Sequence, residues 1–234
     1  MGANGVPASY GGWDQIVEHF TLLNDPNFEF VVYCTHVTNG KDYSRHNNAQ
    51  VRVVKLDANG WQSIPYDMVS LYLAWRECDA AIMLGVSGAL ALPIFRLAGL
   101  PVILNIDGAE WKRGKWNRVI KAFLWLSEYV GIRSAKVVVS DSDVLSDYVR
   151  SKYNKEPRTI AYGGDHVKLQ PAGAKLSELG LTPNHYAITV CRIVPENNVD
   201  LILSAFSETS IVFILVGNFN SSDFGRELRR IYAS

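Results

Sequence analysis

The chain has 234 residues, of which 48% are hydrophobic and 11% aromatic, and its formal net charge is zero. This apolar content suffices for a substantial core and excludes a disordered protein. The balanced charge argues against a nucleic-acid-binding protein that relies on overall positive charge. The three cysteines lie far apart, so their spacing predicts neither a disulfide framework nor a metal site, and a reducing cytosol suits them.

The first informative segment is residues 5–18, GVPASYGGWDQIVE, in which a turn without bulky side chains runs into a helical pattern. The paired glycines Gly11 and Gly12 let backbone N–H groups approach a ligand closely. The start of the helix adds unpaired N–H donors and the positive end of the helix dipole. The segment therefore predicts either a diphosphate-binding loop or an ordinary loop before a capped helix.

Apolar, strand-like runs alternate with helical segments along the first 162 residues. Expected strands cover residues 28–35, 51–56, 80–84, 101–106, 136–140 and 159–162, and expected helices cover 13–23, 66–76, 89–97, 116–132 and 144–152. Continuous apolar strands separated by helices are typical of a parallel sheet with helices on both faces. We therefore predict an α/β, Rossmann-like domain over residues 1–167.

Asp107 is the strongest chemical candidate in this domain. It follows the expected strand at 101–106, so it lies at a carboxyl end, where open α/β sheets place their ligands. A carboxylate there, followed by Gly108, can bind a sugar hydroxyl or orient an acceptor. The alternative interpretation is structural, because aspartate is also preferred as the cap of a following helix.

Residues 111–136 form a basic segment, with seven Lys or Arg side chains and a single acidic residue, Glu128. Apolar residues interleave at roughly helical spacing, which suits a helix at an anionic membrane surface or near a lipid diphosphate. An ordinary solvated helix packed on the sheet is the alternative. The longest uncharged run, residues 80–95, is short for a membrane-spanning helix and is interrupted by glycine and proline.

A change of composition predicts a linker over residues 168–184 and a second domain over 185–234. Its expected elements are a strand at 186–191, a helix at 199–206, a strand at 211–216 and a helix at 223–232. This is one βαβα unit of a second Rossmann-like domain. Because doubly wound domains usually have more strands, we predict that this second domain is incomplete.

Arg192 is the candidate residue of the second domain, since it follows the expected strand at 186–191. A fixed cation at this carboxyl end would stabilise charge that develops on a departing nucleotide diphosphate. Glu196 would either orient Arg192 or simply begin the next helix. The histidines show no metal-ligand spacing, and we predict neither a metal nor a cofactor.

Residues 2–12, GANGVPASYGG, resemble the opening of family 4 glycosyltransferases, in the subgroup with a rhamnosyltransferase-like N-terminal domain. Further segments resemble that subgroup in the same order, at residues 58–67, 84–88, 105–116, 162–166 and 192–198. The resemblance implies the GT-B fold, in which two Rossmann-like domains face each other across a cleft. It also implies transfer of a sugar, with rhamnose as a candidate, from a nucleotide-sugar donor with retained anomeric configuration and no essential metal.

With this resemblance we assign roles to single residues. The catalytic residues would be Asp107 and Arg192. The donor diphosphate would be bound by Gly11, Gly12, Arg192, Glu196 and Asn197. The acceptor and membrane side would comprise Tyr10, Ser87, Lys112, Arg113 and Lys115. The family commonly carries histidine near the position of Asp107 and lysine at that of Asn197, so the expected site departs from the family pattern.

The expected partners are a nucleotide-sugar donor and a glycan or polyprenyl-diphosphate-linked acceptor of cell-surface polysaccharide synthesis, and no nucleic acid. The expected location is the cytoplasm, at the inner face of the cytoplasmic membrane. The family's first strand and the paired glutamates of its donor domain are not found, so we expect a chain truncated at both ends and inactive by itself.

Two alternatives stay open. A GT-B sugar-nucleotide epimerase would convert the donor without an acceptor. A non-catalytic module would bind a sugar or a lipid carrier but no nucleotide sugar.

Overall fold

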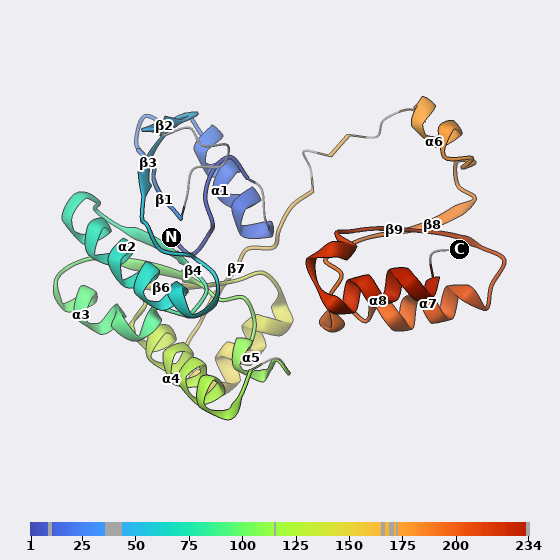
Figure 1. Ribbon diagram of the computed structural model, residues 1–234. Coiled ribbons are helices and arrows are strands. Elements are labelled where there is room, and N and C mark those ends of the chain that lie inside the picture. The colour runs from blue at the N-terminus through green and yellow to red at the C-terminus, as the bar shows by residue number, and fades with distance from the viewer. Residues whose placement is uncertain are drawn as a thin grey trace. The chain divides into compact units, whose positions relative to one another are not determined.

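The computed structural model describes residues 1–8, 11–35, 44–114, 116–164, 167–168, 171 and 173–232 (Figure 1). The chain divides into two compact units, Met1–Gly163 and Gly164–Ser234. The first unit contains a parallel sheet flanked by helices, which confirms the predicted Rossmann-like α/β class. The second is a smaller α/β unit.

The main sheet of the first unit has four parallel strands in the order β4-β5-β6-β7. These strands are β4 (Ala81–Leu84), β5 (Val102–Asn105), β6 (Val137–Ser140) and β7 (Arg158–Thr159). In the register, Ile103 of β5 lies opposite Val137 of β6. Leu104 and Val138 are fully buried. Burial on both faces of a parallel sheet explains why these strands are continuous apolar runs in the sequence.

A second sheet in this unit has the strand order β1-β3-β2. Strands β1 (Val31–Cys34) and β3 (Ala49–Val53) are parallel, whereas β2 (Arg45–His46) pairs with β3 in the antiparallel sense. A tight turn joins β2 to β3, and in it Asn47 has a φ of 50°. Asparagine tolerates this left-handed conformation, which short hairpins require. This hairpin departs from the all-parallel arrangement that the sequence predicts.

Residues 1–4 run between the two sheets (Figure 1). On one side the Met1 ammonium donates to the Ile82 carbonyl at 3.0 Å, and Leu84 N donates to the Met1 carbonyl at 3.0 Å. On the other side Thr35 N donates to the Asn4 carbonyl at 2.9 Å. Gly2 has a φ of 93°, and a Cβ there would lie 2.0 Å from the Leu84 oxygen, so only glycine fits. These residues form no strand, yet they bond to both sheets and connect them.

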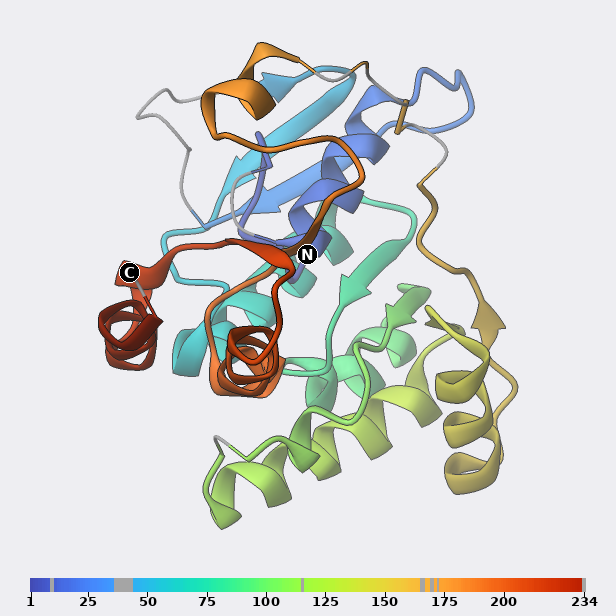
Figure 2. The ribbon, with the colours of Figure 1, turned by 90° about the vertical axis from the view of Figure 1, so that its right-hand side faces the viewer.

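Among the described residues of the first unit, five helices cover the sheets. They are α1 (Gly12–Leu22), α2 (Ser63–Glu77), α3 (Leu92–Leu97), α4 (Arg118–Ser134) and α5 (Asp143–Tyr153), with short 3-10 turns η1 (Gly60–Gln62), η2 (Ala89–Ala91) and η3 (Glu110–Lys112). The N-cap of α4 is Asn117, whose side chain accepts from Ile120 N at 2.9 Å. Helix α3 packs against α4 (Figures 1 and 2). Within the described ranges, no helix is both long and apolar enough to cross a membrane.

The second unit pairs β8 (Tyr186–Val190) with β9 (Val212–Val216) in parallel. Helices α7 (Val199–Ser207) and α8 (Asp223–Tyr232) lie together along this pair (Figure 1), and η4 (Pro195–Asn197) and η5 (Phe219–Ser221) precede them. A small core forms around Ile193, Val199 and Leu228. These strands and helices agree with the predicted βαβα order. Helix α6 (Ala174–Glu178) lies inside the segment predicted as a linker, so that segment is not wholly irregular.

Candidate functional site

Strands β4, β5 and β6 end at one edge of the parallel sheet, and the pairing continues into the loops that follow. Gly85 N donates to the Asn105 carbonyl at 2.9 Å, and Ile106 N donates to the Val139 carbonyl at 3.1 Å. The loops after β5 and β6 then begin with Asp107 and Asp141. Asp107 is predicted here from its place after a strand. Asp141 is not, although the same strand-end rule applied to residues 136–140 would have found it.

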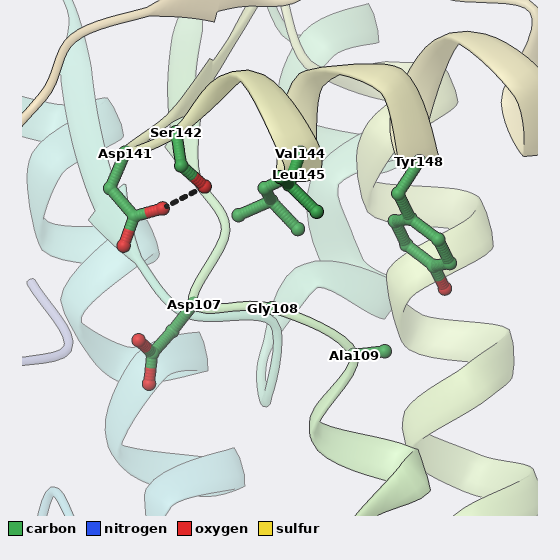
Figure 3. A pocket seen from close by; sticks show the side chains of 8 residues that line it. All are labelled: Asp107, Gly108, Ala109, Asp141, Ser142, Val144, Leu145 and Tyr148. Carbon is green, nitrogen blue, oxygen red and sulfur yellow. Dashed lines mark hydrogen bonds between the residues drawn. The ribbon is translucent and has the colours of Figure 1, made fainter.

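A hollow of about 380 Å³ opens at this edge (Figure 3). Its lining residues are Asp107, Gly108, Ala109, Asp141, Ser142, Val144, Leu145 and Tyr148. The first three come from the loop after β5, and the others come from the two residues that follow β6 and from the first two turns of α5. Figure 3 shows the two aspartates toward one end of the hollow and Tyr148 toward the other. The Ser142 hydroxyl donates to Asp141 Oδ1 at 3.1 Å.

Asp107, which lines this hollow, belongs to a network of charged side chains with Arg113 and Glu110. Arg113 Nη2 is 3.4 Å from Asp107 Oδ2, and Arg113 Nε is 2.7 Å from Glu110 Oε2. Trp116 Nε1 donates to Glu110 Oε1 at 3.0 Å. The cap of η3 is Ala109 and that of α4 is Asn117, so Asp107 caps neither helix. The N-cap positions of η3 and α4 are thus held by other residues, and the half-exposed Asp107 carboxylate lies 3.4 Å from Arg113.

A buried carboxylate, Glu128 of α4, ties the two walls of the hollow together. Its Oε1 accepts hydrogen bonds from Trp111 Nε1 at 3.2 Å, from the Tyr148 hydroxyl at 2.6 Å and from the Tyr153 hydroxyl. Lys152 Nζ lies 3.6 Å from the same oxygen. Trp111 belongs to the loop after β5 and Tyr148 to α5, so Glu128 fixes one to the other. This role could not be predicted from the sequence, where Glu128 is the single acidic residue of the basic segment 111–136.

The environment of Glu128 changes the acidity of its neighbours. Burial, and then the hydrogen bond to Glu128, raises the pKa of Tyr148 to about 12. Burial raises the pKa of Tyr153 as well, and the adjacent Glu128 adds to that increase. Burial lowers the pKa of Lys152 against the opposing attraction of Glu128. Both tyrosines therefore stay protonated near neutral pH and act as hydrogen-bond donors.

The loop after β4 is held in place by hydrogen bonds to Asp67 of α2. Ser87 Oγ donates to Asp67 Oδ2 at 2.5 Å, and Gly88 N donates to the same oxygen at 3.0 Å. Asp67 is completely buried, and burial raises its pKa to about 6. Gly85 has a φ of 88°, and a Cβ there would lie 2.7 Å from Cη2 of Trp13, so α1 packs directly on this loop. Ser87, predicted on the acceptor side, has its hydroxyl engaged in this anchor.

The family model described as Domain of unknown function (DUF1972) matches residues 1–165. The chain belongs to the DUF1972 family. The match extends through every element from α1 to β7, and so includes the hollow and the residues that line it. No curated protein matches the chain.

The glycine loop of the DUF1972 domain precedes α1. Gly11 has an extended backbone with a φ of −160°, and no described atom lies within 4 Å of a Cβ built at Gly11 or Gly12. Neither backbone strain nor packing against described residues therefore requires glycine at these two positions. Two carboxylates of α1 hold the preceding chain, since Asn4 N donates to Asp14 Oδ1 at 2.8 Å and Ala8 N donates to Glu18 Oε2 at 3.1 Å.

The residues predicted on the acceptor side of the DUF1972 domain are only partly brought together. Arg113 pairs with Asp107 at the hollow. Lys112 Nζ lies 5.0 Å from the ring centroid of Tyr148, which lines the hollow. Tyr10 and Lys115 lie outside the described residues. Within the described ranges, no group of three or more His, Cys, Asp or Glu side chains could hold a metal ion.

The predicted donor-side residues other than Gly11 and Gly12 lie in the second unit, outside the DUF1972 match. Arg192 follows β8 as predicted, is exposed, and forms no ion pair with a described residue. Asn197 Nδ2 donates to the Arg192 carbonyl at 2.8 Å, so this amide holds the loop. Glu196 lies in the first turn of η4, in agreement with the alternative interpretation that it begins a helical turn. Their role toward a donor stays a prediction.

Proposed function

We propose that this protein is a retaining glycosyltransferase of the GT-B type, related to family 4. It would transfer a sugar, with rhamnose as a candidate, from a nucleotide-sugar donor to a glycan or lipid-linked acceptor of cell-surface polysaccharides. The DUF1972 domain is found in glycosyltransferase-associated proteins, which supports this class. The observation that carries the proposal is the hollow at the carboxyl edge of the sheet, with Asp107 at its mouth.

In the proposed reaction, the Asp107 carboxylate accepts a hydrogen bond from a hydroxyl of the acceptor. An ionised carboxylate has about four acceptor positions on its two oxygens. Arg113 Nη2 lies 3.4 Å from Oδ2, and the Asp107 side chain is 46% exposed, so a sugar hydroxyl can reach the same carboxylate. The pairing of Arg113 with Glu110 at 2.7 Å also fixes the guanidinium in place. Asp107 is thereby held ready to orient a hydroxyl without first reorganising its surroundings.

Donor activation is assigned to Gly11, Gly12 and Arg192. Backbone N–H groups at the start of α1 form the kind of site that binds phosphate oxygens. Side chains are absent at Gly11 and Gly12, and the space above them is open within the described part of the chain. Arg192 would offset the negative charge that develops on the departing nucleotide diphosphate, which is the part that a divalent cation takes in metal-dependent transferases.

We also propose that the protein contacts a membrane peripherally. Helices α3 and α4 pack side by side and expose large apolar side chains, with Ile94 67%, Leu97 90% and Val119 79% exposed. Arg96, Arg118 and Lys121 lie on the same two helices. Apolar side chains combined with cations suit the surface of an anionic bilayer, where a lipid-linked acceptor would be found.

The test is Asp107→Asn in the intact enzyme, assayed with a panel of nucleotide sugars and glycan acceptors. We expect turnover to fall about 10- to 100-fold, because a neutral amide cannot replace a charge-assisted hydrogen bond. Asp79→Asn, an exposed aspartate after α2, serves as the control. Full turnover in Asp107→Asn would remove Asp107 from the mechanism. Conversion of the donor without any acceptor would instead identify an epimerase.

A further inference from the structure

Glu128 of α4 is buried, yet it bonds through Oε1 to two side chains at the hollow. Tyr148, whose hydroxyl donates to Oε1 at 2.6 Å, lines the hollow (Figure 3). Trp111, whose Nε1 donates to Oε1 at 3.2 Å, comes shortly after the lining residue Ala109. Trp111 Nε1 also donates to the Tyr148 hydroxyl at 3.3 Å. The loop after β5 and helix α5 are therefore bonded to each other as well as to Glu128.

Asp107 begins the loop that Trp111 holds. The next residue, Gly108, has a φ of 75°, and no described atom lies within 4 Å of a Cβ built there. Glycine in this left-handed conformation bends the chain without a side chain that could pack on its neighbours. Trp111 is the middle residue of η3, the turn that follows. Its hydrogen bonds therefore join the loop of Asp107 to α4 and α5.

The residue before Glu128 holds the neighbouring loop. Ser127 is completely buried, and its hydroxyl donates to the Val86 carbonyl at 2.6 Å. The same hydroxyl accepts from Leu90 N, at 3.1 Å, in η2. Two adjacent polar residues of α4 thus bind the loops that follow β4 and β5, which lie at the same edge of the sheet.

Stability alone is a weak reason for a carboxylate in this place. Apolar residues of similar volume often replace a buried ionic group with no loss of stability, or with a gain. Glu128 Oε2 is buried and has no hydrogen-bond partner among the described residues. Hydrogen bonds are directional, so an indole N–H and a phenol O–H that meet at one oxygen fix the positions of both side chains.

We propose that Glu128 is a positioning residue of the transferase site. By holding Trp111 and Tyr148 at one oxygen, it sets the place of Asp107 relative to the α5 wall of the hollow. A hydroxyl bound by Asp107 is then held in the geometry that the reaction needs. The inference rests on the proposed function, in which Asp107 binds the acceptor. The Glu128 side chain is 1% exposed, so it acts through Asp107 and does not contact the acceptor.

The test compares Trp111→Phe with Trp75→Phe. Each variant keeps an aromatic ring and loses an indole N–H donor, which bonds to Glu128 in one case and to the Ala98 carbonyl, at 3.1 Å, in the other. Urea unfolding of both variants measures the loss of stability that a structural hydrogen bond explains. In the intact enzyme, Trp111→Phe should lower kcat about 10- to 100-fold with the KM for the donor unchanged. Trp75→Phe should keep the wild-type kcat.

Amide hydrogen exchange of the full chain tests the positioning without any substrate. Trp111→Phe should speed the exchange of residues 108–113 about tenfold, because the loop opens more often once its bond to Glu128 is lost. Exchange at Val138, in the core of the sheet, should not change. Trp75→Phe should leave the exchange of residues 108–113 as it is in the wild type.

Glu128→Gln and Glu128→Met provide the conservative comparison. Glutamine keeps a carbonyl oxygen that can accept from Trp111 and Tyr148, whereas methionine does not. Glu128→Gln should therefore retain about tenfold more turnover than Glu128→Met.

The proposal is overturned if Trp111→Phe matches Trp75→Phe in both kcat and loop exchange. It is also overturned if the donor KM changes in place of kcat, or if Glu128→Met turns over as fast as Glu128→Gln. Failure of the proposed function is a different result, namely no sugar transfer by the wild-type enzyme. The exchange measurement then still decides whether Glu128 fixes the loop after β5.

Discussion

Asp107 and Arg192 occupy equivalent positions in two different units. Each follows a parallel strand, β5 or β8, and each side chain is open to solvent where the strand ends. Their surroundings differ, because Asp107 is paired with Arg113 whereas Arg192 has no ion-pair partner among the described residues. An unpaired guanidinium held at a strand end keeps its full charge for an anionic ligand.

We predict that Arg192→Ala in the intact enzyme lowers turnover at least about a hundredfold, as for the loss of one preorganised charge donor. Steady-state turnover with saturating donor measures this. The matched control is Arg226→Ala in the same unit, where the guanidinium is occupied by Asp223. If both variants turn over like the wild type, Arg192 has no part in stabilising the leaving group.

Glu128 acts at the scale of elements, because it joins η3, α4 and α5 through side chains that are far apart in the sequence. Its bonds to Trp111 and Tyr148 span 17 and 20 residues respectively. Its second oxygen, Oε2, is buried and has no hydrogen-bond partner among the described residues. Burying a carboxylate costs desolvation free energy. Here several hydrogen bonds to the first oxygen, Oε1, offset that cost.

Helices α3 and α4 expose the apolar side chains of Leu97 and Val119. We expect the double variant Leu97→Glu, Val119→Glu to weaken binding to anionic vesicles by at least about tenfold, since burying one such side chain contributes about 1.5–3 kcal/mol. Co-sedimentation with phosphatidylglycerol vesicles measures binding. Ile160→Glu is the control, since Ile160 is an apolar residue after β7 that is 59% exposed. Equal losses in the two proteins would place the membrane contact elsewhere.

For the molecule as a whole, the first unit depends on residues 1–4, which connect its two sheets. Beneath them Asp67 is completely buried and bonds Ser87 and Gly88, and the Met1 ammonium acts on it electrostatically. Burial outweighs these three favourable interactions and raises the pKa of Asp67 to about 6. Asp67 therefore interacts both with the loop after β4 and with the N-terminal residues that connect the two sheets.

This group makes the stability of the protein depend on pH. The folded pKa of Asp67 exceeds its unfolded value, so the folded state binds the proton more tightly and is favoured at low pH. This contribution is present below pH 4 and is lost as the pH rises through about 6. We expect the free energy of unfolding to fall by about 2 kcal/mol relative to Asp67→Asn between pH 4 and 7.

Urea unfolding of both proteins at several pH values measures this difference. Asp79→Asn, which changes an exposed aspartate, should follow the wild-type curve. Parallel curves for the wild type and Asp67→Asn would show that Asp67 does not titrate in this range.

The sequence alone determined the α/β class, the order of the main strands and helices, and the position of Asp107 after a strand. These features are local, since apolar runs, helical spacing and strand ends are visible in windows of 5–20 residues. The same rule applied to residues 136–140 would have added Asp141. Strand β2 was not predicted from the sequence, because a strand of two residues is too short to show an alternating pattern of apolar and polar side chains.

Which side chains contact one another is visible only in the folded molecule. Tyr148 and Asp107 line one hollow although 41 residues separate them, and Glu128 binds Trp111 from another helix. The tertiary structure also showed that Ser87 is engaged by Asp67 and that residues 1–4 connect two sheets. Contacts of this kind depend on how helices pack over the sheet, and no local pattern of residue types encodes that packing.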